Sequence, residues 1–233
     1  EDLRSPNGSL TSSRKATLVV DFSGTVHLAW SDGFSFNADS SQDGVANIFY
    51  RQKSANGVWS APTQATLNGA IRTGSSLVLR NSGEIHLVFC DYSNQIKHLR
   101  WNGSLWSHEG VVATSPTYVE NLRAAAGDDN RLFTVWYDPS TPPRIMHSGF
   151  DGAIWSAPEQ ISRQDAASVG IYPVVAVDAL NRPHFVWSER FSIVDELGQN
   201  RRINSLRYRS KQGTVLSPPI QLHKDSQWGT LSS

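Results

Sequence analysis

Acidic residues recur at one place in the sequence, two positions after an aromatic residue that ends a short apolar run. The acids are Asp32, Asp91, Asp138 and Glu189, and the aromatics are Trp30, Phe89, Trp136 and Trp187. A short acidic side chain can cap a turn by accepting backbone N–H bonds, or four such acids can present carboxylates to a ligand on one rim. Residues that recur in every repeat are usually architectural, so turn capping is favoured and a ligand role stays open.

Charged insertions follow two of these acids. Residues 31–46 contain Asp32, Asp39 and Asp43, and residues 188–203 contain Glu189, Arg190, Asp195, Glu196, Arg201 and Arg202. The connections between repeats add Arg72, Tyr118, Glu120, Arg123, Tyr172 and Trp228. Repeat-specific insertions on one face commonly mark a binding side, although surface loops also vary freely.

Aromatic side chains combined with guanidinium or carboxylate groups are typical of sites for sugars or charged small molecules. We therefore expect a ligand site on this loop face, formed by Arg72, Asp91, Tyr118, Arg123, Asp138, Tyr172, Glu189, Arg190, Arg201, Arg202 and Trp228. The spacing of Asp39 and Asp43 does not match a calcium loop, and we expect no metal.

Histidines also recur, and comparing the same position in the other repeats tests whether histidine is needed there. His27, His86 and His184 share one place, where the third repeat has Phe133. His98 and His147 share another, where the first and last repeats have Tyr50 and Tyr208. Since an aromatic ring of similar bulk suffices at each place, these histidines are interpreted as packing residues, and no cofactor is expected.

The elements that position these residues form a repeat of about 50 residues with about four strands, which is typical of a β-propeller blade. In each repeat the turn before the second strand ends at Gly24, Gly83, Asn130 or Asn181. The turn after the third strand contains Gly57, Gly103, Gly152 or Gly213. Only Gly and Asn occupy the first set, as expected where a hairpin needs a positive φ. The fold class is therefore all-β, a propeller of four-stranded antiparallel blades.

The expected strands are 16–20, 25–30, 47–51 and 58–64; 76–80, 84–89, 95–101 and 105–112; 122–126, 131–136, 144–149 and 154–161; and 174–177, 183–187, 204–209 and 215–222. The blades span about 16–70, 71–121, 122–172 and 173–233, after a polar lead-in or closing strand at 1–15. Pro62, Pro158, Pro218 and Pro219 fall in the fourth strands, so these strands should be outer edges. The strand-end aromatics should pack between blades. Residues 227–231 resemble the approach to a fifth inner strand, so we expect the ring to be incomplete, or to be completed by further blades or another chain.

Composition excludes several function classes. The 233 residues carry 21 basic and 21 acidic side chains and are 39% hydrophobic, which favours a large core and gives no charge bias toward nucleic acid or anionic membranes. No run is long enough for a membrane span, and the start has no apolar signal core, so the chain is either mature or cytosolic; we expect an extracellular or cell-surface location. The one cysteine, Cys90, is interpreted as a structural thiol.

Three segments carry a family resemblance: 54–59 (SANGVW), 101–106 (WNGSLW) and 150–155 (FDGAIW). They resemble degenerate Asp-box (bacterial neuraminidase) repeats of the sialidase-like propellers, although the Asp of the box is kept only at Asp151 and is Asn at 56 and 102. The resemblance implies a propeller fold, with the box as a folding element on the face opposite the active site.

Three functions compete on this basis. The first is a non-catalytic module that recognises a glycan or protein ligand on the loop face. The second, implied by the resemblance, is a sialidase-type glycoside hydrolase, with three arginines, a Tyr activated by a Glu, and an Asp; the candidates are Arg72, Arg123, Arg190, Tyr172, Glu120 and Asp91. The third is a structural or assembly role. The family's Arg-Ile-Pro entry motif does not occur, which favours the first and third.

Overall fold

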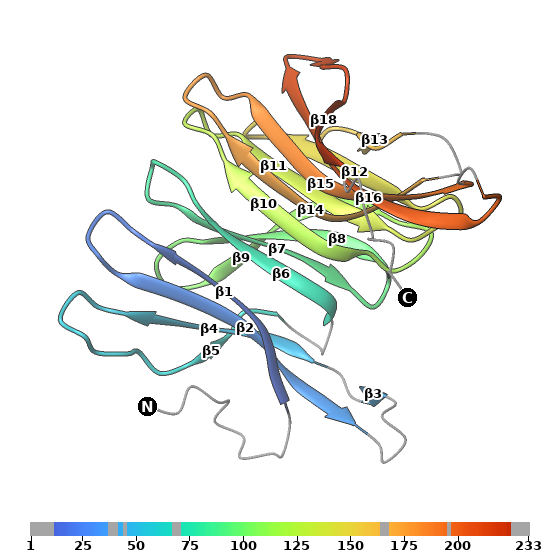
Figure 1. The fold of residues 1–233 in the computed structure, drawn as a ribbon. Helices are drawn as coiled ribbons and strands as arrows, with labels where there is room; N and C mark the ends of the chain where they lie inside the picture. The colour runs from blue at the N-terminus through green and yellow to red at the C-terminus, as the bar shows by residue number, and fades with distance from the viewer. Residues whose placement is uncertain are drawn as a thin grey trace. The chain divides into compact units, whose positions relative to one another are not determined.

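The computed structural model describes residues 12–36, 42–43, 46–66, 71–163, 168–194 and 197–224. This part of the chain is built of antiparallel strands and turns, without a helix; accordingly, no helix in it is a candidate for crossing a membrane. The chain divides into two compact units, Glu1–Tyr118 and Val119–Ser233. Each unit contains two sheets of four or five strands (Figure 1).

The first unit contains the first and second sheets. The first sheet has the order β1 (Ser12–Val20), β2 (Val26–Phe36), β4 (Asn47–Lys53), β5 (Thr63–Gln64), with β3 (Gln42–Asp43) paired to β2. The second sheet has the order β6 (Ile71–Leu79), β7 (Ile85–Asp91), β8 (Gln95–Trp101), β9 (Trp106–Thr114). Strand β6 lies against β1 and β2, so the sheets pack through the first strand of the second one.

The second unit repeats this arrangement. The third sheet has the order β10 (Glu120–Ala126), β11 (Leu132–Asp138), β12 (Arg144–Phe150), β13 (Glu159–Gln160). The fourth has the order β14 (Ser168–Val177), β15 (Pro183–Val194), β16 (Asn200–Gln212), β17 (Val215–Leu216), with β18 (Ile220–Lys224) also paired to β16. Strand β14 lies against β10, β11 and β12.

The fourth strands lie at the sheet edges as expected, but three of them are shorter than expected. The edge segments of the first and third sheets keep only two-residue strands and isolated bridges from Trp59 and Trp155, and the edge of the fourth sheet splits into β17 and β18. Each of these segments contains proline, which lacks the N–H that a ladder needs. The second sheet has no proline there, and β9 runs for nine residues.

The loop expected at 188–203 is also largely strand. Strands β15 and β16 continue their ladder outward to the pair Val194–Asn200, so the insertion is a long hairpin. Alternating side chains along these two strands therefore point to opposite faces.

The turns follow the sequence-based expectation. Gly24, Gly83, Asn130 and Asn181 have φ of 81°, 84°, 71° and 58°. Only Gly, and less readily Asn, adopts this left-handed conformation at low cost, which explains the restriction to these two residue types.

Each unit buries an apolar cluster between its two sheets. In the first unit the cluster includes Ile48, Tyr50, Leu87 and Phe89; in the second it is Val135, Ile145, Ile161, Phe185 and Trp187. All four strand-end aromatics are buried. Phe89 and Trp187 pack between sheets as predicted, whereas Trp30 clusters with Leu28, Phe49 and Trp59 of its own sheet.

Candidate functional site at the bulged end of the fourth sheet

The first strand of every sheet carries a β-bulge near one end. The register shifts between Arg14 and Thr17, Ile71 and Ser75, Glu120 and Arg123, and Ile171 and Val174. Within three of these bulges Lys15, Asn121 and Tyr172 have φ of 52°, 51° and 53°. A left-handed Asn is unremarkable, whereas a left-handed aromatic residue is rare, and such strain concentrates at functional sites.

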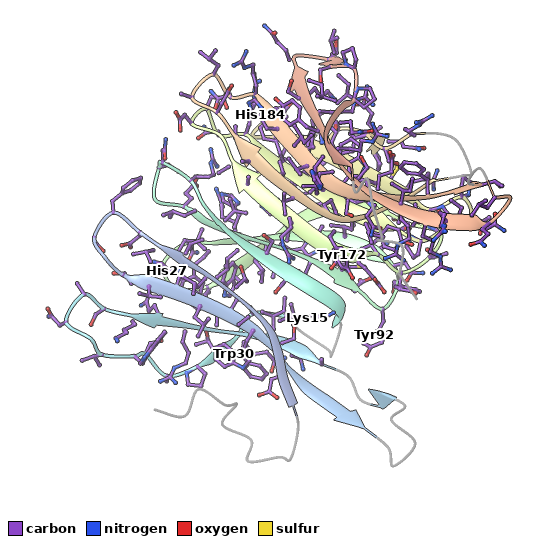
Figure 2. The ribbon with its side chains drawn as sticks, in the orientation of Figure 1. Lys15, His27, Trp30, Tyr92, Tyr172 and His184 are labelled. Carbon is purple, nitrogen blue, oxygen red and sulfur yellow. The ribbon has the colours of Figure 1, made fainter. Side chains whose placement is uncertain are left out.

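The bulge at Tyr172 turns a large aromatic side chain toward solvent. Tyr172 is 65% exposed, and Figure 2 labels it on the fourth sheet. Two residues earlier the strand is pressed into the core: a Cβ at Gly170 would lie 2.7 Å from Ile145 Cγ1 and 3.3 Å from Trp187 Cδ1. Bulges commonly redirect a side chain next to a site. Here the chain passes from the closely packed Gly170 to the solvent-exposed ring of Tyr172 within two residues.

The β14–β15 ladder places Glu189 and Arg190 beside this bulge. Gly170 pairs with Glu189, and Val169 pairs with Arg190. Glu189 is completely buried, and its Oε2 accepts a 2.6 Å bond from Arg207 Nε. The charge-assisted hydrogen bond to the half-buried guanidinium of Arg207 fixes the orientation of this carboxylate.

Two polar atoms at this end of β15 have no hydrogen-bond partner among the described residues. They are Glu189 Oε1 and Trp187 Nε1, both on buried side chains. The two residues share one face of β15 because they are two positions apart. Buried polar groups are rarely left unpaired, and each of these atoms is suited to bond an ordered water, which both donates and accepts.

The outer hairpin adds cations on both faces. Arg190 is exposed and donates from Nε to Asn204 Oδ1 at 3.4 Å. Arg202 pairs with Ser192, two positions along the ladder, so it shares the face of Arg190, whereas Arg201 pairs with Ile193 on the other face. Arg201 and Arg202 are both exposed.

The acids of the other sheets are committed to internal contacts. Asp91 Oδ2 lies 2.6 Å from Lys97 Nζ, and Asp138 Oδ2 lies 2.8 Å from Arg144 Nη2. Asp91 also accepts from the N–H of Gln95, and Asp138 from that of Ser140, as turn capping expects. Asp32 is buried as well. Among the three recurrent acids whose partners are described, Asp91, Asp138 and Glu189, Glu189 differs because its second oxygen has none within the described residues.

The remaining candidates are more dispersed. Exposed Arg123 donates from Nη1 to the carbonyl of Leu122, and half-buried Glu120 lies opposite Tyr137 at the β10 bulge. Arg72, Asp91 and Tyr118 belong to the first unit, with Tyr118 37% exposed. Trp228, Asp39, Asp195 and Glu196, and the side chains of Arg72 and Asp43, lie outside the described residues. The structure thus places Tyr172, Glu189 and Arg190 on the neighbouring strands β14 and β15, with Glu189 buried, Tyr172 and Arg190 exposed, and Arg202 on the face of Arg190 further along the hairpin.

The recurrent histidines form internal networks. His27 Nδ1 lies 2.7 Å from Tyr50 Oη and its Nε2 3.2 Å from Asp21 Oδ2; His184 makes the same contacts with Tyr208 and Asp178, at 2.7 and 3.1 Å. In Figure 2, His27 and His184 are labelled on the second strands of their sheets. Their repetition indicates an architectural role. No three His, Cys, Asp or Glu side chains gather as a metal site within the described ranges.

In the second sheet a pair of histidines takes the place of the Asp–His–Tyr contacts of the first and fourth sheets. His86 Nδ1 lies 2.8 Å from His98 Nε2. Burial lowers the pKa of His86 to about 3, with further contributions from His98 and Arg80. The aspartates Asp21 and Asp178 were not singled out from the sequence; their signal was their position six residues before a recurrent histidine.

The Asp-box-like turns keep their local geometry without a strict Asp. Asp151 Oδ1 accepts from the N–H groups of Ala153 and Ile154 at 2.9 and 2.8 Å, and Asn102 Oδ1 accepts from Ser104 and Leu105, both at 2.9 Å. An amide oxygen serves this turn as well as a carboxylate.

No model of a known protein family matches the sequence, and no curated protein matches it. The Asp-box resemblance is therefore without support from a family model. Solved structures do match the fold. The chain is similar to an α-L-arabinanase of Penicillium chrysogenum, at 12% identity and a TM-score of 0.61, over 90% of this chain and 66% of that one. It is also similar to the fucose-specific lectin of Aleuria aurantia, at 14% identity and a TM-score of 0.53, over 91% of this chain and 63% of that one.

A third similar structure is a mannose phosphorylase of Leishmania mexicana, at 9% identity and a TM-score of 0.51, over 91% of this chain and 68% of that one. The chain thus spans about two thirds of each of these three proteins. At such low identity the likeness concerns the fold. Its neighbours in structure are β-propeller-type proteins that bind or act on glycans, and the chain has an all-β fold of this type.

Proposed function

We propose that this protein is a non-catalytic carbohydrate-recognition module that binds a glycan at the bulged end of the fourth sheet. The observation that carries the proposal is Tyr172, an aromatic residue held in a left-handed conformation and 65% exposed beside Glu189 and Arg190. The glycan-related structural neighbours support the same class of ligand.

The chemistry of this end of the sheet suits a sugar. An exposed aromatic face stacks on the C–H face of a pyranose or furanose ring, and convergent polar groups fix its hydroxyls. The guanidinium of Arg190 is an exposed planar donor for the ring hydroxyls. Glu189 and Trp187 point to the other face of β15 with buried side chains, so they support the strand beneath the site and do not contact the ligand.

The internal contacts of the recurrent acids favour a binding role over hydrolysis. Glycoside hydrolysis needs two carboxyl groups about 5–10 Å apart, one of which is protonated before reaction. In the second unit, Asp138 and Glu189 are both buried and ion-paired with arginines, so both are engaged in internal contacts and are not presented to a glycosidic bond. A sialidase-type hydrolase, using Tyr172, Glu120 and Asp91, is the alternative, and an assembly role is the third. An extracellular or cell-surface location is proposed with the glycan-binding role.

A glycan array followed by calorimetry with the best-bound glycan tests the proposal. Tyr172→Asn removes the ring but keeps the backbone, because Asn121 holds the same conformation in β10. We expect at least a tenfold loss of affinity in Tyr172→Asn and in Arg190→Ala, with unfolding unchanged.

The matched control is Tyr92→Ala, since Tyr92 is an exposed aromatic on the turn after β7 (Figure 2). The control should bind normally. Full affinity in Tyr172→Asn, or no glycan retained by the wild type, would contradict the proposal. Turnover of fluorogenic sialosides or arabinosides, lost on changing Tyr172 or Glu120, would establish the hydrolase instead.

A further inference from the structure

A pocket of about 230 Å³ lies between the third and fourth sheets, at the turn end of the strands. Its walls include Arg131, Phe133, His147, Gly149, Phe150 and Lys211. The hairpin turn at Asn181 also contributes to the lining. Since Pro183 at the start of β15 lines the pocket while Glu189 lies six residues further along that strand, this pocket is separate from the glycan site proposed above.

The corresponding place in the first unit is filled. Tyr50 and His147 are equivalent, because each lies opposite the residue that precedes a strand-end tryptophan. Tyr50 packs on Trp101 and Trp106, with ring centroids 4.8 and 5.3 Å apart. His147 instead contacts Lys211 and the ring of Phe185. Trp101 and Trp106 correspond to Lys211 and Leu216, which pair with each other as the two tryptophans do.

A second difference opens the space further. Gln52 lies opposite His27, and at the equivalent place Gly149 lies opposite Phe133. A Cβ at Gly149 would make only ordinary contacts, at 3.5 Å from the Phe133 ring. The third sheet therefore lacks a side chain where one would fit, and the ring of Phe133, which is 8% exposed, forms a wall of the pocket instead.

Two cationic side chains line the pocket, and each is paired with an acid that is not in the lining. Lys211 Nζ lies 2.5 Å from Glu159 Oε2 and 3.2 Å from His147 Nε2, and Arg131 Nε lies 2.9 Å from Asp129 Oδ2. Arg131 and Lys211 line the pocket, but Glu159 and Asp129 do not. The one lining acid, Asp151, uses Oδ1 to hold its own turn.

His147 completes this arrangement as a neutral base. Burial, followed by the nearby Lys211, lowers the pKa of His147 to about 4. At neutral pH the imidazole can therefore accept a hydrogen bond from the Lys211 ammonium, which leaves that ammonium with a third N–H directed elsewhere.

We infer that this pocket binds a single uronic acid residue, a sugar ring that carries one carboxylate. The carboxylate would be bound by Lys211 and Arg131, and an apolar face of the ring would lie on Phe133 or Phe150. The pocket is smaller than the roughly 300–1,000 Å³ typical of sites for drug-sized ligands, which suits one sugar unit. Binding here does not depend on the glycan site at Tyr172.

The test uses saturation-transfer NMR and calorimetry with sodium glucuronate and galacturonate, compared with glucose and sodium acetate. We expect the uronates to bind, and glucose and acetate to bind at least tenfold more weakly. Gly149→Gln restores the side chain of the first sheet and should abolish uronate binding by filling the pocket; Lys211→Gln should weaken it at least tenfold. Lys53→Gln, at the equivalent place of Phe150 on the first sheet, is the control and should bind like the wild type.

Equal affinity for glucose and glucuronate would overturn the assignment of an acidic ligand. Full uronate binding by Gly149→Gln would overturn the location. Tyr172→Asn should leave uronate binding intact. The experiment therefore tests the proposal for this pocket separately from the proposal for the glycan site at Tyr172. Unchanged circular dichroism and urea midpoints in each variant exclude loss of fold as the cause.

Discussion

The replacement Gly170→Ala tests how tightly the first strand of the fourth sheet is packed beneath the proposed glycan site. The new methyl carbon would lie 2.7 Å from Ile145 Cγ1 and 3.3 Å from Trp187 Cδ1. Both neighbours are completely buried members of the same apolar cluster. Neither is a flexible surface side chain that can swing away, so β14 or the cluster must shift.

The magnitude follows from two opposing effects. Overpacking a core by a methyl group costs about 1–3 kcal/mol. The loss of chain entropy in the unfolded state returns about 0.4–1 kcal/mol when Gly becomes Ala. We expect a net decrease in the free energy of unfolding of about 1–2 kcal/mol, or roughly 2–4 °C in melting temperature per kcal/mol for a chain of this size.

Urea unfolding monitored by tryptophan fluorescence measures this change, with Gly74→Ala as the matched control. A Cβ at Gly74 has Lys15 Cδ as its nearest neighbour, at 3.8 Å, which is ordinary contact with a flexible side chain. This control should be as stable as the wild type or more stable by up to about 1 kcal/mol. The reasoning is refuted if Gly170→Ala unfolds at the wild-type midpoint, or if Gly74→Ala is the more damaging of the two.

Three further predictions concern the core, the buried ion pair and pH. Trp136→Ala should lower the free energy of unfolding by about 3–5 kcal/mol, since the ring is buried; an unchanged melting temperature would place the ring at the surface. Arg207→Ala should cost about 3–5 kcal/mol because it leaves Glu189 buried without a counter-charge, whereas Arg207→Met with Glu189→Leu should recover most of that loss; equal stability of the single and double variants would contradict this. Because burial lowers the pKa of His147 to about 4, the unfolded chain, with a pKa near 6.5, binds more protons between these values. Stability should therefore be full above about pH 6.5, fall as the pH decreases toward 4, and change no further from this residue below that. The urea midpoint of His147→Phe should therefore depend less steeply on pH between about 6.5 and 4 than that of the wild type. An identical pH dependence would show that His147 is not buried in its neutral form.

Local rules determined much of what could be inferred from the sequence. The alternation of apolar residues and the spacing of the strand-end aromatics identified the strands, because side-chain period and burial are properties of each strand. The restriction of Gly24, Gly83, Asn130 and Asn181 to two residue types identified the positive φ, because only those residues adopt it cheaply. Proline identified the edge strands but not how far each would shorten, since shortening depends on the neighbouring ladder.

The tertiary structure decided the rest, through contacts between residues distant in the sequence. Nothing in the residue type marks Tyr172 as left-handed; it takes this conformation in a bulge that recurs in the first strand of each sheet, where Lys15 and Asn121 have a similar φ. The recurrent acids look alike in the sequence, yet Glu189 alone among those with described partners keeps an unpartnered oxygen. Asp91 and Asp138 also accept from a backbone N–H of the turn that follows, whereas at Glu189 the ladder continues and no turn follows. The pocket at His147 exists because two tryptophans of one unit are replaced by Lys211 and Leu216 in the other, and the volume they leave open depends on side chains packed across two sheets.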